Sequence, residues 1–135
     1  MNPANFLDHA TQYLEAARRL SQTEPFIFKP TFYCAIHSVE LSLKGHLLHQ
    51  GCSLKALRRK EFGHNIGQLL EQALKNGAID ESILDVFYQR AVIRGSYDYS
   101  AKCFEYPEIM YSTYPIGKWL NIAEDLASSL QVKLS

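Results

Sequence analysis

The sequence has few of the features that stabilise small secreted proteins. Its 135 residues include only three cysteines, Cys34, Cys52 and Cys103, and their spacing shows no pairing. An odd and scattered set argues against a disulfide framework and fits a reducing compartment. The first residues carry acidic and polar groups where a signal peptide needs a basic start and an apolar block. We therefore expect a cytoplasmic protein.

Long apolar runs and net charge are also missing. No segment approaches the roughly 18 consecutive apolar residues of a membrane-spanning helix, so we expect no membrane association. Lys and Arg total 14, as do Asp and Glu, which gives a formal net charge of zero. Residues 1–60 hold eight basic and four acidic residues, whereas residues 61–135 hold six basic and ten acidic ones. This balance argues against a strongly cationic nucleic-acid binder but leaves room for a local basic patch.

The common catalytic signatures are absent as well. No serine occupies a nucleophile elbow, no glycine-rich loop is present to cradle phosphate, and no cysteine pair forms a redox motif. Two sets of metal-ligating residue types have three-residue spacing, but positions i, i+3 and i+6 drift around a helix and do not converge. We expect neither a bound metal nor another cofactor. The two sets are His46, His49 and Cys52, and Cys34, His37 and Glu40.

Apolar residues recur at helical spacing through most of the chain, most clearly in residues 30–51. Pro30 suits the first helical position of this segment, and Gly51 suits its end. A polar stripe beside the apolar face includes Glu40 and Lys44, one turn apart in the favourable order of acid before base. We predict that this long, partly buried helix is the central helix of the fold.

Caps and helix breakers predict the remaining elements. Short joints between helices force neighbours to run in opposite directions. We therefore predict one domain over residues 1–135, an all-α, antiparallel up-down bundle of four to five helices. Its other expected elements are a helix over about 3–21 capped by Asn2, an extended connector over 24–30 pressed onto the core, a short helical turn after Ser53, a helix ended by Gly77, a helix over 81–94 capped by Asp80 and ended by Gly95, and a last helix opened by Pro115.

Residues 95–114 lack a clear period and are rich in aromatic side chains. A loop of about twenty residues is long for a compact domain, and such loops are often functional. Tyrosine faces can stack on bases while a nearby Arg94 or Lys102 meets phosphate. The structural alternative is that the rings pack into the core or an interface. The six aromatic residues are Tyr97, Tyr99, Phe104, Tyr106, Tyr111 and Tyr114.

Three motifs resemble those of small bacterial HEPN-domain proteins. ELSLKG at 40–45 and GHNIGQLLEQA at 63–73 match two helical motifs of the family, and FEYP at 104–107 approximates an aromatic third, with Glu105 where the family often has Arg. The resemblance covers about residues 30–125. It implies a HEPN-like helical bundle, a homodimer, and a role in toxin-antitoxin, defence or RNA-processing systems, with a cognate antitoxin or other protein as partner.

The resemblance also implies where a nuclease site would lie. Many HEPN proteins that cut RNA use an Arg followed four to six residues later by His, from both subunits and without a metal. The Arg would hold the phosphate while the His assists proton transfer. No His follows Arg94 at that spacing, whereas Arg59 precedes His64 by five residues. The catalytic candidates are therefore Arg59 with His64, or Arg94 with Tyr97.

Three functional hypotheses follow. The first is a non-catalytic binding protein for RNA, a nucleotide or a cognate protein partner. The second is a metal-independent HEPN-type ribonuclease with a site shared across a homodimer, and the third is a structural dimerisation module. Convergence of His37, Glu40 and His64 with an arginine of the predicted 81–94 helix would favour the enzyme. The candidate ligand-binding residues are Glu40, Lys44, His64, Arg90, Arg94, Tyr97 and Tyr99.

Overall fold

The computed structural model describes residues 2–58, 65–100 and 115–135, without the side chains of residues 86, 87, 97, 98 and 100. Within these ranges there are six helices and no strand, which confirms the all-α prediction. None of the described helices is long and apolar enough to cross a bilayer. The helices are α1 (Pro3–Ser21), α2 (Phe28–His49), α3 (Leu54–Leu57), α4 (Ile66–Lys75), α5 (Val86–Ser100) and α6 (Ile116–Leu134).

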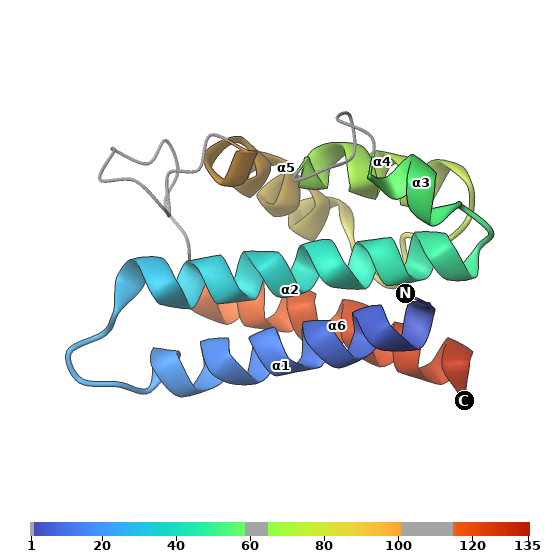
Figure 1. Ribbon diagram of the computed structural model, residues 1–135. Helices are drawn as coiled ribbons and strands as arrows, with labels where there is room; N and C mark the ends of the chain where they lie inside the picture. Colours follow the sequence, from blue (N-terminus) through green and yellow to red (C-terminus); the bar gives the residue numbers. More distant parts are fainter. Residues whose placement is uncertain (1, 59–64, 101–114) are drawn as a thin grey trace.

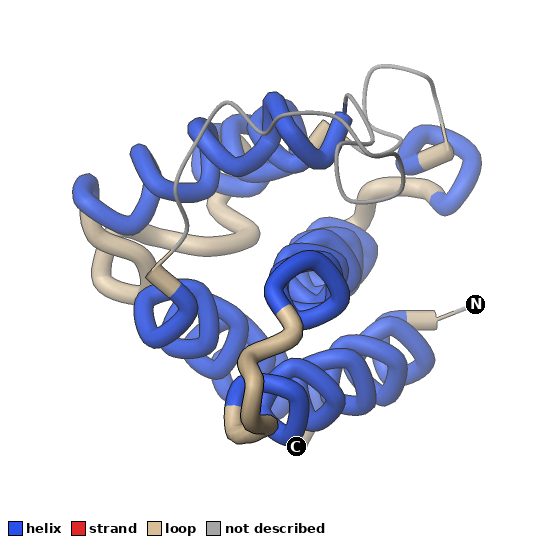
Figure 2. The backbone as a smooth tube through the Cα atoms, turned by 90° about the vertical axis from the view of Figure 1, so that its left-hand side faces the viewer, coloured by secondary structure: helices blue, strands red, loops and turns tan. Residues whose placement is uncertain are grey.

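α2 lies between two layers of helices. α1 and α6 pack on one side of it, and α3, α4 and α5 lie on the other (Figures 1 and 2). Thirteen of the 22 residues of α2 are buried, including Glu40 of the predicted polar stripe and the further polar residues Ser38, Ser42 and His46. The prediction of a central helix is therefore confirmed, and part of its polar stripe lies in the interior.

The ends of α1 and α2 follow from local chemistry. Asn2 and Asn5 exchange two hydrogen bonds of 2.9 Å between side chain and backbone, which caps α1 where the sequence predicts. α2 begins two residues before Pro30, so this proline occupies the third helical position rather than the first. The shift is tolerated because the first turn has no internal partners for its N–H groups. Gly51, with φ +113°, closes α2 as expected.

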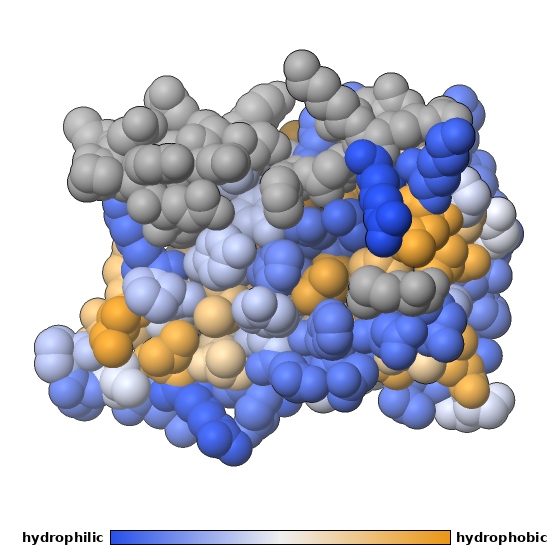
Figure 3. Space-filling view, in the orientation of Figure 1, coloured by the Kyte–Doolittle hydropathy of each residue, from blue (hydrophilic) through white to orange (hydrophobic). Residues whose placement is uncertain are grey.

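The connector between α1 and α2 differs from its prediction. Phe26, Ile27 and Phe28 keep 41, 43 and 38% of their surface exposed, so they are not pressed into the core. The rings of Phe26 and Phe28 contact Phe32, which is itself buried. In Figure 3, hydrophobic surface gathers at the end of the molecule where α1 and α2 are joined. Aromatic contacts within the turn replace the expected burial.

The predicted helix over 81–94 is wrong at both ends. Asp80 bonds Ser82 within a turn, whereas Asp85 accepts a 2.9 Å hydrogen bond from the Tyr88 amide and caps α5. α5 then continues through Gly95 to Ser100. A glycine inside a helix costs about 1 kcal/mol relative to alanine. The turn after Gly95 is held on α2 by the hydrogen bond from Tyr99 to Glu40. Residues 101–114 of the expected loop lie outside the described residues.

The other predicted signals are confirmed. The Ser53 hydroxyl accepts a 3.0 Å hydrogen bond from the Ala56 amide and caps α3. Gly77, with φ +79°, follows α4, and Pro115 immediately precedes α6. Trp119 on α6 is 1% exposed and belongs to the main core. These elements position α4 and α5 side by side above α2.

Candidate functional site

A buried polar cluster lies at the middle of α2. Glu40 is 1% exposed, and each of its carboxylate oxygens accepts a hydrogen bond. The Tyr99 hydroxyl donates to Oε1 at 2.6 Å, and the Lys44 ammonium donates to Oε2 at 3.1 Å. Tyr99 belongs to α5, so the cluster joins α5 to α2. The sequence predicts the pair of Glu40 and Lys44, but the link to Tyr99 crosses 59 residues and has no local signal.

His37 extends this cluster towards α1. Its Nδ1 lies 2.6 Å from the Tyr99 hydroxyl. A phenol has one proton, and Tyr99 donates it to Glu40, so Nδ1–H of His37 must donate to the Tyr99 oxygen. Tyr13 of α1 meets the imidazole edge-on at 4.4 Å, and Tyr33 stacks on it at 5.5 Å between ring centroids. Hydrogen bonds and ring contacts therefore fix the imidazole in one orientation.

The cluster is arranged to hold helices together. A buried carboxylate is stable only when charged and hydrogen-bonded partners compensate its lost hydration. Both oxygens of Glu40 accept hydrogen bonds from side chains of the protein, Lys44 and Tyr99, and Tyr99 belongs to α5. The arrangement therefore positions the C-terminal turn of α5 on α2.

The arginine candidates do not join this cluster. Arg90 and Arg94 are exposed on α5. Arg94 and Tyr99 are five residues apart, which turns them by about 140° around the helix. Arg59 and His64 lie outside the described residues, as does the side chain of Tyr97. Of the groups whose convergence would favour an enzyme, His37 and Glu40 meet, whereas the α5 arginines point elsewhere.

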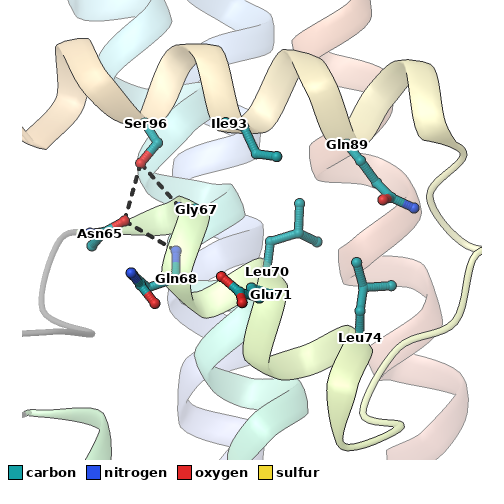
Figure 4. A pocket seen from close by; sticks show the side chains of 9 residues that line it. All are labelled: Asn65, Gly67, Gln68, Leu70, Glu71, Leu74, Gln89, Ile93 and Ser96. Carbon is teal, nitrogen blue, oxygen red and sulfur yellow. Dashed lines mark hydrogen bonds between the residues drawn. The ribbon is translucent and has the colours of Figure 1, made fainter.

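A second candidate site is an open groove of about 470 Å³ between α4 and α5 (Figure 4). Its floor is apolar, and amide, hydroxyl and carboxylate groups line its walls. We call this feature the α4–α5 groove. The residues that line it are Asn65, Gly67, Gln68, Leu70, Glu71, Leu74, Gln89, Ile93 and Ser96.

Hydrogen bonds close one end of the α4–α5 groove. The Ser96 hydroxyl accepts from the Gly67 amide at 3.1 Å and donates to Asn65 Oδ1 at 3.4 Å. Asn65 Oδ1 also accepts from the Gln68 amide at 3.1 Å, which caps α4. This network holds the start of α4 against α5 and is drawn as dashed lines in Figure 4.

The open part of the groove combines apolar and polar surface. Ile93 is 46% exposed, although it is a large aliphatic residue on a packed helix. Gln68 and Glu71 are exposed on α4. The side-chain nitrogen of Gln89 donates to the Leu84 carbonyl at 2.8 Å, so this amide can offer a ligand its oxygen. The groove can therefore contact an apolar face and bond a polar edge.

Two cations, Lys75 on α4 and Arg90 on α5, lie beside the groove. Lys75 directly follows the lining residue Leu74, and Arg90 and Arg94 directly follow Gln89 and Ile93. All three are exposed. Lys75 lies one turn beyond Glu71, about 40° around α4, and Arg90 lies about 100° from Gln89, whereas Arg94 lies about 140° from Gln89 and faces away from the groove. Sequence reasoning identified the two arginines but missed the groove. The sequence signal that could have indicated the groove is the pair Leu74 and Ile93, which are apolar residues at the edges of the apolar faces of α4 and α5.

A third polar contact lies at the far end of α2. His46 is fully buried, its Nε2 donates to the Leu126 carbonyl at 2.9 Å, and Lys133 Nζ donates to Nδ1 at 2.8 Å. The pKa of His46 is lowered to about 4, mainly because the ring is buried; the Leu126 hydrogen bond opposes this shift, and the charge of Lys133 adds to it. Lys133 also donates to the Ala78 carbonyl, and burial lowers the pKa of its ammonium group. This contact fastens the end of α6 to α2.

No three His, Cys, Asp or Glu side chains converge as metal ligands among the residues that the structure describes. Comparison of the chain with protein-family models, curated proteins and solved structures finds no match. The HEPN resemblance of the sequence motifs therefore stays a prediction.

Proposed function

We propose that this chain is a non-catalytic helical binding protein that holds RNA or a nucleotide in the α4–α5 groove. The observation that carries the proposal is the composition of the groove, in which an apolar floor and hydrogen-bonding walls lie beside two exposed cations, Lys75 and Arg90. An HEPN-like up-down bundle, a homodimer and a toxin-antitoxin, defence or RNA-processing role belong to the same proposal. They rest on the sequence motifs.

The dimensions and chemistry of the groove suit a base with its phosphate. Small-molecule pockets measure roughly 300–1,000 Å³ and combine mostly apolar lining with a few polar groups. Ile93 and Leu74 offer aliphatic surface to the face of a base, and Gln68 and Glu71 offer hydrogen bonds to its edge. Arg90, next to the lining residue Gln89, offers its guanidinium group to a phosphate outside the groove. The walls thus provide one contact for each part of a nucleotide.

The buried cluster supports binding rather than catalysis. A general base must reach the proton that it removes. Glu40 is 1% exposed and already bonded to Lys44 and Tyr99, and the arginine side chains on α5 lie on another side of that helix. In this proposal the cluster keeps α5 in place so that the groove holds its shape.

The test compares two apolar-to-acid substitutions at exposed positions. Ile93→Glu places a charge in the groove, whereas Val132→Glu places one on α6, where Val132 is 73% exposed. A labelled single-stranded RNA and the four nucleoside monophosphates are titrated with each protein by fluorescence anisotropy and calorimetry. We expect Ile93→Glu to weaken binding by about tenfold or more. The new carboxylate would be repelled by the phosphate of the ligand or buried beneath its base, and either effect costs more than the loss of the isoleucine contact. Val132→Glu should bind as the parent does.

Absence of RNA and nucleotide binding by the folded parent protein would overturn the proposal, as would equal binding by both variants. The same samples are incubated with RNA in the absence of metal, and their mass is measured by light scattering. RNA cleavage that Arg94→Ala abolishes would favour the ribonuclease alternative. A monomeric mass would remove the homodimer from the proposal.

A further inference from the structure

One charged side chain lies inside the α4–α5 groove. Among the described lining residues, Glu71 alone carries a formal charge, and it is negative. A carboxylate repels phosphate, so it is out of place in a site that recognises phosphate alone. The two oxygens of the Glu71 carboxylate can instead accept two hydrogen bonds from the edge of a base. Lys75, one turn beyond Glu71 on the same side of α4, and Arg90 on α5 provide the positive charge beside this position.

A carboxylate distinguishes the four bases by their donors. The pairing edge of guanine presents two adjacent donors, the N1–H and the 2-amino group, which can bond the two oxygens in parallel. Adenine and cytosine each place a ring-nitrogen acceptor beside their amino group, and the N3–H of uracil lies between two carbonyl acceptors. On each of these three bases, a carboxylate that bonds the donor would also face a neighbouring acceptor, which repels it. Bidentate, charge-assisted hydrogen bonds are stronger and more directional than single neutral ones.

The neighbouring amide completes the edge of guanine. Gln68 precedes Glu71 by three residues, so the two side chains lie on the same side of α4, about 5–6 Å apart at their Cβ atoms. Figure 4 shows both at the open side of the groove. While Glu71 accepts from N1–H and the 2-amino group, the amide nitrogen of Gln68 can donate to O6 of the same base. Leu74 and Ile93 then lie within reach of its face.

We propose that the α4–α5 groove selects guanine, with Glu71 as the residue that determines specificity. This inference rests on the proposed function and adds the identity of the base. The ligand class is a guanine nucleotide or a single-stranded RNA that presents an unpaired guanine. Both provide the same base edge and the same adjacent phosphate.

The test removes one donor from the ligand and one acceptor from the protein. GMP, IMP and AMP are titrated by calorimetry, since IMP keeps N1–H and O6 but lacks the 2-amino group. We expect the parent protein to bind GMP about tenfold more tightly than IMP, and IMP more tightly than AMP, as a hydrogen bond to a charged group provides. In Glu71→Gln the preference for GMP over IMP should fall to about twofold or less.

The matched control is Glu15→Gln on α1. It makes the same chemical change on the opposite side of α2 from the groove, at an exposed residue that pairs with Arg19. This variant should keep the preference of the parent. Equal affinity of the parent for GMP, IMP and AMP would overturn the guanine inference while leaving nucleotide binding intact. If no nucleotide or RNA binds, the proposed function itself fails.

A second arm distinguishes the two sources of guanine. A ten-nucleotide uridine-rich RNA is prepared with one central guanosine and, separately, with inosine at that position. Tighter binding of the guanosine strand than of GMP, with the same loss for inosine, identifies RNA as the ligand. Tighter binding of GMP or GTP than of the strand identifies a free nucleotide. A strand that binds equally with guanosine and inosine would contradict guanine selection in RNA.

Discussion

Acidification should destabilise this protein through His46. The imidazole is fully buried between α2 and α6, and burial lowers its pKa from 6.5 to about 4. In the unfolded chain the same imidazole is hydrated and titrates near its ordinary value. Because the folded pKa is the lower of the two, the unfolded chain takes up the proton first. The contribution of His46 is therefore complete above about pH 6.5 and is lost as the pH falls towards about 4.

The size of the effect follows from the difference between the two pKa values. A shift of about 2.5 units, at about 1.4 kcal/mol per unit, gives a loss of about 3 kcal/mol over this range. Against a typical unfolding free energy of about 5–15 kcal/mol, that loss is large. Lys133 contributes to it, because a protonated imidazole would face the ammonium group that now donates to its Nδ1.

Urea unfolding at pH 7.5, 6.5, 5.5 and 4.5 measures the effect. Carboxyl groups also titrate at the low end, so the useful quantity is the difference in slope between the parent and His46→Gln, which cannot titrate. We expect the slope of the parent between pH 6.5 and 4.5 to exceed that of the variant by about one kcal/mol per pH unit. The imidazole resonance of His46 should titrate near pH 4 by NMR. Parallel slopes and an NMR pKa near 6.5 would show that His46 does not make stability depend on pH.

Two further predictions concern packing and the buried cluster. Tyr99→Phe removes the donor to Glu40 Oε1, and we expect a loss of about 1–3 kcal/mol in urea unfolding, because a buried carboxylate loses a partner; an unchanged midpoint would contradict this role. Gly45→Ala places a Cβ about 2.5 Å from Leu130 Cδ2, so overpacking of about 1–3 kcal/mol should exceed the gain in helix propensity. Gly117→Ala on α6 meets nothing within 4 Å and should be neutral or stabilising; the reverse order of the two melting temperatures would contradict the packing argument.

The helices of this chain are largely predictable because their signals are local. Asn2 and Ser53 cap helices where the sequence predicts, and Gly51 and Gly77 follow helices with positive φ. α5 begins later than predicted because Asp85, rather than Asp80, caps it. It ends later than predicted because the contact of Tyr99 with α2 holds the helix past Gly95. Such differences are decided by packing, which a local pattern does not contain.

The site was less predictable for the same reason. Glu40 and Lys44 lie one turn apart and could be paired from spacing alone. Their partner Tyr99 and the contact of His46 with Lys133 join positions 59 and 87 residues apart. The α4–α5 groove forms where two helices with separate patterns meet, so its polar and apolar residues become one surface only in the fold.

Chemical-shift mapping shows whether a guanine nucleotide binds in the α4–α5 groove. The ¹⁵N-labelled protein is titrated with GMP and with the guanosine-containing RNA strand, and the amide signals are followed to saturation. We expect the largest changes at Gln68, Glu71 and Ile93, and we expect them to disappear in Ile93→Glu. Saturating ligand without changes in α4 and α5, or with changes confined to α1 and α6, would contradict this expectation.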